Sequence, residues 1–190
     1  MNTQTLSSGD QHSNALATQE LDNIITQNEI YAEQALRRKK AEQLINRNIL
    51  IAVGCGLLPM PLVDAAGVAT IEIVMIGELA KIYGFPFPNR LALIKMFLSV
   101  VGSIGSIYVV SHSRSALTTI PLIGYLASAT VYSMANGVAV FAVGKVFQHH
   151  FESGGTLLSL DKKSTKKLYH SEYQRGKLVV PQLVAAHAGT

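Results

Sequence analysis

Several residue types are scarce in this chain of 190 residues. It has no tryptophan, one cysteine, and charged residues at only 15% of its positions. A single cysteine excludes an internal disulfide, and because Cys55 lies in an apolar run we interpret it as a small buried hydrophobe. Residues 1–18 lack a basic stretch followed by an apolar one, which argues against a cleaved secretory signal. We therefore expect the chain to start in the cytosol.

Charge is scarcest in the middle of the chain, where two apolar segments follow each other. The first, 91–110, has Lys95 as its only charge, and about 20 apolar residues are needed to cross a bilayer. The second, 116–143, has no charged residue. The short linker 111–115 permits only an antiparallel arrangement of the two. We predict an all-α, membrane-associated fold with a central apolar helical hairpin over 91–147.

Small residues recur four positions apart in both apolar segments. Ser99 and Ser103 do so in the first segment, and Ala129, Ser133 and Gly137 do so in the second. Such ridges let helix backbones approach closely, both in lipid and in a tightly packed soluble bundle. A wholly soluble helical bundle therefore stays open as an alternative.

The N-terminal part divides into a polar tail and an amphipathic helix. Residues 1–15 are rich in Ser, Thr, Asn and Gln, so we predict a disordered tail. Residues 16–48 contain neither glycine nor proline, and their apolar residues fall on one helical stripe. The stripe consists of Leu21, Ile24, Ile25, Ala32, Ala35 and Leu36. We predict that this helix covers part of its own domain or docks a partner; a coiled coil stays open, although sustained heptads are absent.

Two prolines divide the stretch that follows. Pro59 and Pro61 each remove a backbone donor and break a helix. A second helix is predicted over 62–83, with Asp64 placed to satisfy its positive N-terminal end. Because Glu72 would be unfavourable against lipid, we expect this helix to be buried in protein or to lie at the membrane interface.

Basic residues are concentrated in two clusters, 37–40 and 162–167, which flank the apolar segments. Lysine and arginine in such flanks lie beside anionic cytoplasmic lipids. Nucleic-acid binding needs a basic face with many phosphate contacts, and the net charge of +4 is modest. The linker 111–115 carries only Arg114, so the positive-inside rule predicts that both termini are cytoplasmic. We expect membrane lipids as partners and no nucleic acid.

The most obvious chemical candidates are His149, His150 and Glu152. Adjacent histidines point about 100° apart on a helix, and the chain has no HExxH motif, so the spacing does not predict a metal site. Ser153 lacks the strand-to-helix setting of a nucleophile elbow. We expect no catalytic residue, no metal and no cofactor.

The glycines at 154–155 are predicted to end the long apolar helix, as left-handed residues do. A short apolar return follows, and then a basic helix over 162–174, for which Asp161 or Ser164 is the N-cap. We treat 171–190 as a C-terminal tail.

Motifs spread over roughly 44–169 resemble a known family. We regard the residues that carry it as a structural or interaction motif: Pro59, Pro61, Asp64, Glu72, Tyr83, Gly84, His150, Glu152, Gly154 and Gly155. The run 141–147, which leads into His150, also belongs to the resemblance. In this order they resemble the YcjF-related family, a domain of unknown function known mostly from bacteria. The resemblance departs at Glu72, where the family pattern usually has glutamine.

The resemblance implies a helical, membrane-associated domain over 49–170 that is often fused to, or encoded beside, dynamin-like or Era-like GTPases and is linked to envelope stress. This chain has no GTPase motif of its own. The nearest approach, Gly137 to Lys145, has the wrong glycine spacing and is followed by Val146, where a Ser or Thr must reach magnesium. A GTPase partner would be a separate chain.

These observations predict a non-enzymatic adaptor or scaffold at the bacterial inner membrane. It would act with a separate GTPase or another cytoplasmic protein in envelope or stress physiology, and it could also form a homo-oligomer. The alternative is a membrane-active protein of the pore-forming or toxin-like class. Its apolar hairpin would be sheathed in a soluble cytoplasmic form and would insert when triggered.

Overall fold

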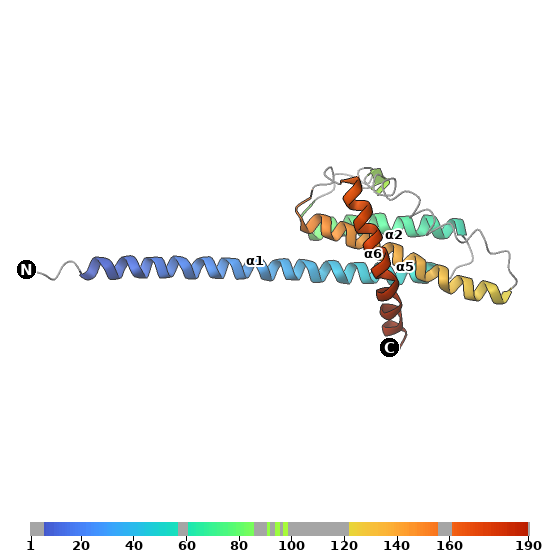
Figure 1. Cartoon of the computed structure of the whole chain (residues 1–190), viewed down its shortest axis with the longest axis horizontal. Helices are drawn as coiled ribbons and strands as arrows, with labels where there is room; N and C mark the ends of the chain where they lie inside the picture. The colour runs from blue at the N-terminus through green and yellow to red at the C-terminus, as the bar shows by residue number, and fades with distance from the viewer. Residues whose placement is uncertain are drawn as a thin grey trace, which may run out of the picture. The chain divides into compact units, whose positions relative to one another are not determined.

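The computed structural model describes residues 6–56, 61–85, 122–155 and 161–189, together with Leu91, Ile94, Lys95, Phe97 and Leu98. Four helices are assigned within these residues: α1 (Leu6–Cys55), α2 (Pro61–Ile82), α5 (Leu122–Glu152) and α6 (Lys162–Ala188) (Figure 1). The prediction of an all-α chain is confirmed.

The chain divides into two units, Met1–Lys39 and Lys40–Thr190. In the first unit, the described residues form the N-terminal part of α1, and the side chains of residues 18–39 are almost all exposed. The second unit contains the rest of α1 with α2, α5 and α6, and it holds the buried core.

Helix α1 begins earlier and ends later than the predicted helix over 16–48. The helix begins at Leu6, inside the segment 1–15 for which we predicted disorder, and it continues to Cys55 instead of ending near residue 48. Propagation adds one hydrogen bond for each residue fixed, so a long helix extends over polar residues that would not start one. At the other end, Ile49 and Ala52 are fully buried, and core packing carries the helix onward.

Helix α5 lies at the centre of the second unit. The other helices contribute buried residues around it: Ile45 and Ile49 from α1, Met75 and Leu79 from α2, and Tyr169 and Val180 from α6. Every side chain from Asn136 to Gly144 is buried, so α5 is surrounded on all sides over this stretch. A helix that is apolar all round is expected in such a position.

The predicted membrane hairpin can be followed only in its second half. Within the described residues one helical stretch, Thr130–Glu152, is long and apolar enough to cross a membrane, and 67% of its most apolar window is buried inside the fold. In this fold most apolar side chains of Thr130–Glu152 pack inside the protein core. The linker 111–115 and most of 91–110 lie outside the described residues, so the hairpin itself stays a prediction.

Small residues bring α1 and α5 together as antiparallel neighbours. A Cβ on Gly137 would lie 2.6 Å from Val53 Cγ2, and one on Gly144 would lie 2.9 Å from Ile45 Cγ1. The Ser133 hydroxyl donates a hydrogen bond to the Val53 carbonyl oxygen. The predicted close approach at Ser133 and Gly137 is therefore present, between two helices of the core. Ser99, Ser103 and the side chain of Ala129 lie outside the described part of the chain.

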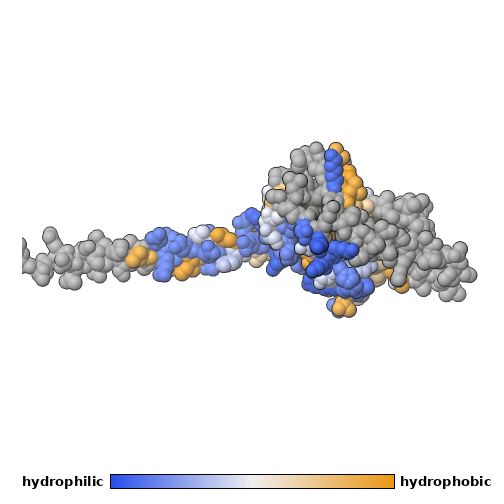
Figure 2. All heavy atoms as spheres, turned by 45° about the horizontal axis from the view of Figure 1, so that its top comes forward, coloured by the Kyte–Doolittle hydropathy of each residue, from blue (hydrophilic) through white to orange (hydrophobic). Residues whose placement is uncertain are grey.

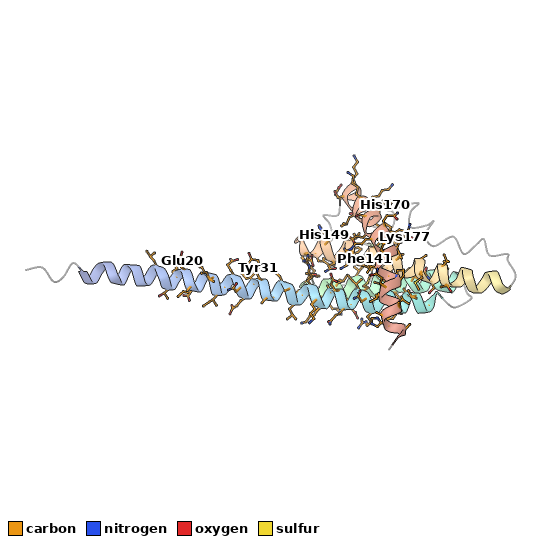
Figure 3. All side chains as sticks on the ribbon, turned by 60° about the horizontal axis from the view of Figure 1, so that its bottom comes forward. Glu20, Tyr31, Phe141, His149, His170 and Lys177 are labelled. Atoms are coloured by element: carbon orange, nitrogen blue, oxygen red, sulfur yellow. The ribbon has the colours of Figure 1, made fainter. Side chains whose placement is uncertain are left out.

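Helix α6 crosses α5 at Phe141 and Gly176, where a Cβ on the glycine would lie 2.9 Å from the ring (Figures 1 and 3). It continues past residue 174 and through Pro181, so the segment 171–190, predicted as a tail, is helical to Ala188. Proline removes one helical hydrogen bond. The fully buried Val180 beside it shows that packing on the core offsets this loss.

The N-terminus of α6 is capped as one of the two predicted alternatives requires. Asp161 has extended backbone geometry, and its carboxylate accepts a hydrogen bond from the Ser164 backbone N–H at 2.9 Å. That bond lowers the pKa of the Asp161 carboxyl, because it stabilises the charged form.

Candidate functional site

Helix α2 ends in a Schellman motif built around Gly84. Gly84 has φ of +79°, and its N–H donates to the Lys81 carbonyl at 3.1 Å. The N–H of Phe85 reaches back to the Ala80 carbonyl at 2.8 Å. Only glycine adopts this left-handed backbone without strain, so the predicted end of the helix at Tyr83–Gly84 has a local cause.

Helix α5 ends in the same way. Gly154 has φ of +69° and donates to the Phe151 carbonyl at 3.1 Å, while Gly155 donates to the His150 carbonyl at 3.0 Å. The prediction that these glycines terminate the long helix is confirmed. The ring of His150 occupies the space that a Cβ on Gly155 would need.

The two helix ends meet. Figure 1 shows α2 and α5 running side by side in the same direction, so their C-termini lie at one end of the unit. The Tyr83 hydroxyl donates a hydrogen bond to Glu152 Oε1 at 2.9 Å. Phe151, which is only 3% exposed, packs between the other aromatic rings, 5.5 Å from Phe85 and 6.1 Å from Tyr83 between centroids. We call Tyr83, Phe85, Phe151 and Glu152 the helix-end cluster.

A line of polar contacts joins this cluster to α1. Gln148 Nε2 donates to Glu152 Oε1 at 3.1 Å, and Lys145 Nζ donates to Gln148 Oε1 at 2.9 Å. Lys145 also forms an ion pair with Glu42 at 2.6 Å. Gln148 is 4% exposed, so its amide depends on these partners. The helix-end cluster and these polar contacts together join α1, α2 and α5.

The two histidines near the cluster have separate surroundings. His149 is exposed, and its Nδ1 lies 3.5 Å from the Ser153 hydroxyl, whereas the His150 ring packs 5.9 Å from Phe151 between centroids (His149 is labelled in Figure 3). Both lie in the last turn of α5, where a positive charge would complement the helix dipole. Within the part of the chain that the structure describes, no three His, Cys, Asp or Glu side chains are grouped to hold a metal ion.

The remaining motif residues lie elsewhere. Glu72 is fully buried in the core of the second unit, the first of the two settings predicted for it. It lies about 16 Å before Tyr83 along α2. Pro61 is the first residue of α2, a position where its missing N–H costs nothing. Pro59 and the side chain of Asp64 lie outside the described residues.

A basic groove lies between α1 and α2. It has a volume of about 450 Å³, and its charged lining includes Lys40, Arg47, Lys81 and Glu78. Arg47 and Glu78 form an ion pair at 2.7 Å across it. The lining of the groove is therefore net positive.

Comparison with known proteins identifies the family. A family model described as a domain of unknown function, DUF697, matches residues 21–177. The chain belongs to this family. The assignment confirms the resemblance to the YcjF-related family, and the match also takes in the part of α1 that belongs to the first unit.

One relative of this DUF697 chain carries an informative name. It is magnetosome membrane protein 22 of Magnetospirillum gryphiswaldense, 29% identical over 145 residues, which cover 76% of this chain and 74% of the relative. No solved structure matches the chain significantly.

Sequence reasoning missed several residues of the helix-end cluster and of the polar contacts beside it. It named Tyr83 and Glu152 separately, and it overlooked Phe85, Phe151 and Gln148. Aromatic residues just before or after a glycine helix stop are a signal for such a contact, because a Schellman motif is commonly accompanied by an apolar contact. The partner of each aromatic residue lies on another helix, which no local pattern specifies.

Proposed function

We propose that this DUF697 chain is a non-enzymatic scaffold attached to a membrane. The observation that carries the proposal is the similarity to magnetosome membrane protein 22, because it extends over about three quarters of both chains. A shared membrane location is the simplest property that two chains of this family would retain over such a length.

The use of the motif residues supports a scaffold rather than an enzyme. Tyr83 and Glu152 bond to each other, Gly84 and Gly154 end helices, and Gln148 links Glu152 to Lys145. The Tyr83–Glu152 bond fixes the end of α2 relative to α5, the two glycines fix where these helices end, and the Gln148 bonds order side chains along α5. Side chains engaged in this way maintain a shape, and a fixed shape is what a docking platform requires.

We infer that the basic groove and the first apolar segment together contact the bilayer. Lys40 and Lys81, beside the Arg47–Glu78 ion pair, leave the groove with a net positive charge that anionic headgroups attract, at about 1 kcal/mol per basic residue near the surface. The segment 91–110, which follows the end of α2 in sequence, supplies apolar residues that enter the hydrocarbon. Because α2 before it and α5 after it pack together, the segment returns to the same face of the bilayer. In this arrangement both termini are cytoplasmic, and the membrane is the bacterial inner membrane.

A separate GTPase, or another cytoplasmic protein, is the proposed binding partner of the scaffold. The family resemblance suggests this class of partner. We place its docking surface on the exposed basic face of α6, which includes Lys166, Lys167 and Lys177. An acidic surface on the partner would be complementary and would increase the rate of association. Envelope or stress physiology is the proposed setting.

The membrane-active alternative is retained because of one observation. The stretch Thr130–Glu152 is apolar enough to cross a membrane, yet most of it is buried inside the fold. A chain that releases a sheathed helix on contact with lipid would have this property. The two functions differ in where the protein is found before any trigger.

Fractionation of a bacterium that produces the full chain tests the proposal. Membranes are separated from cytosol and washed with carbonate and then with high salt. We expect retention after both washes. Release by either wash would overturn integral attachment through 91–110, and a cytosolic protein that enters added vesicles would replace the scaffold with the membrane-active alternative.

The partner is tested by affinity purification after chemical cross-linking in the same cells. We expect a GTP-hydrolysing protein to be recovered with the wild-type chain and to be at least about fivefold depleted with Lys166→Glu, because a reversed charge repels an acidic partner. Gln182→Glu is the control, since it adds negative charge to the same helix at an exposed position about 160° around α6 from Lys166. Equal recovery with both variants would contradict docking on α6.

A further inference from the structure

The first unit presents an apolar stripe to solvent. Leu21, Ile24, Ile25 and Leu36 are each between 51% and 59% exposed. At about 100° per residue they fall within about a third of the helix circumference. The described part of this unit contains only the helix, and apolar side chains are visible in patches along it (Figure 2). An apolar stripe of this kind on a long helix normally packs against another surface.

The charges beside the stripe are separated by sign along the helix. The acidic residues come first and the basic residues last: Glu20, Asp22, Glu29 and Glu33, then Arg37, Arg38 and Lys39. No basic residue occurs between 20 and 36. Glu20 projects from the exposed helix in Figure 3. This part of α1 therefore has an acidic half and a basic end.

The charge pattern decides which occupant fits the stripe. An anionic lipid surface would repel the acidic half, which contains three of the four apolar residues of the stripe. A parallel copy of the same helix would set acid against acid and base against base. An antiparallel copy sets the acidic half of each helix against the basic end of the other, and complementary charges of this kind set orientation in helix pairs.

We propose that residues 20–39 pair with the same segment of a second copy of this chain, as an antiparallel two-helix coiled coil. Glu20 and Arg38 are about five helical turns apart, so they lie on the same side of α1. In a two-fold antiparallel pair, Glu20 of one copy then lies beside Arg38 of the other at both ends. The paired length is about 28 Å, or about three heptads.

Polar Asn28 lies near the middle of this segment, one heptad after Leu21 and one heptad before Ala35. It therefore belongs to the same face as the stripe. A polar residue within an apolar seam, asparagine above all, fixes the register and the number of strands, at a cost in stability. Near the two-fold axis of the pair, the Asn28 side chains of the two copies lie close enough to bond to each other.

Thiol cross-linking in cells that produce the full chain tests both the pairing and its direction. Two versions carry different tags on a Cys55→Ala background, which removes the native thiol: one has Glu20→Cys and the other has Arg38→Cys. A short bismaleimide is added to cells that contain either version or both. In the antiparallel pair, like cysteines are about 27 Å apart and unlike cysteines are adjacent.

We expect no cross-linked dimer from either version alone and a mixed dimer when both are present. Cross-linked dimers from each version alone would show a parallel pair, and absence of any dimer would show that the stripe faces lipid, another protein or its own chain; both results would overturn the proposal. Ile30→Cys is the control for random collision, because position 30 lies on the opposite side of the helix from Leu21, and it should give no dimer.

Sedimentation of the purified full chain tests the stripe itself. Leu21→Gln with Ile25→Gln should raise the Kd of the dimer at least about tenfold, because each buried apolar side chain is worth more than a tenfold change in Kd. Ile30→Gln removes a side chain that is 41% exposed on the other face, and it should change the Kd less than about twofold. Equal effects of the two variants would overturn the assignment of this face. The result does not depend on membrane attachment, so it can fail while the scaffold proposal stands.

Discussion

Tyr83 and Glu152 join the ends of two helices through one hydrogen bond of 2.9 Å, although 69 positions separate them in the sequence. The contact is possible because both helices stop at a glycine in the left-handed conformation, one residue after Tyr83 and two after Glu152. Because α2 and α5 are parallel neighbours and end at the same level, their glycine stops bring Tyr83 and Glu152 into contact.

Removal of the Tyr83 hydroxyl should weaken this junction. We expect Tyr83→Phe to lower the free energy of unfolding by about 0.5–1.5 kcal/mol, because the ring stacking remains while one hydrogen bond is lost. Urea denaturation followed by circular dichroism measures the change. Tyr31→Phe is the matched control, since Tyr31 is 64% exposed in the first unit, and it should leave unfolding unchanged. An equal loss in both variants would argue against the Tyr83–Glu152 bond.

The helix stop at Gly154 should tolerate asparagine better than alanine. A left-handed backbone costs a residue with a Cβ about 1–2 kcal/mol, and asparagine less. We therefore expect Gly154→Ala to lower the thermal midpoint more than Gly154→Asn does. Differential scanning calorimetry of the two variants measures the order, and the reverse order would mean that Gly154 has another role.

Gly56 and Gly54 give a matched pair for helix packing. A Cβ on Gly56 would lie 2.6 Å from the Ser133 backbone Cα, while one on Gly54 would meet nothing within 4 Å. We expect Gly56→Ala to destabilise the fold by about 1–3 kcal/mol through overpacking. Gly54→Ala should stabilise α1 by up to about 1 kcal/mol, because alanine favours helix. If the two variants unfold alike in urea, the close approach of α1 and α5 is wrong.

The Asp161 cap should make stability depend on pH. The pKa of this carboxyl is lowered from 3.8 by the hydrogen bond from the Ser164 backbone. The stabilisation is therefore fully present above the unfolded-state pKa and is lost as pH falls through the lower folded-state pKa. We expect Asp161→Ala to unfold at lower urea than the wild type at pH 7, and the difference to shrink below about pH 4. A difference that persists unchanged at about pH 2.5, well below the ordinary carboxyl pKa, would contradict a charged cap.

Local signals in the sequence predicted much of the secondary structure. The bounds of α2 followed from Pro61 and Gly84, the end of α5 followed from Gly154, and the start of α6 followed from Asp161. Each of these residues acts through its own backbone geometry or through bonds to residues within one turn. The extension of α6 beyond residue 174 was not predictable in this way, because Val180 is helical through its burial in the core.

Within the candidate site, the sequence identified Tyr83, Gly84, Glu152 and Gly154 but did not predict that they meet. The meeting depends on the parallel packing of α2 and α5, in which Phe85 contacts Phe151 across the chain. The ion pair of Lys145 with Glu42 was missed for the same reason, since it exists only where α1 lies beside α5. Gln148 bonds within α5, and it was missed because its burial is set by the packing of the core.

The sequence by itself determined the bounds of α2, the end of α5 and the start of α6, and it determined that the charge-free part of α5 must be shielded from water. A charge-free apolar stretch such as 122–143 satisfies that need equally well in lipid and in a protein core, because both exclude water from its side chains. Tertiary structure decided that α5 is shielded by α1, α2 and α6. Gly137 and Gly144 on α5 let α1 approach closely, and Gly176 does the same for α6.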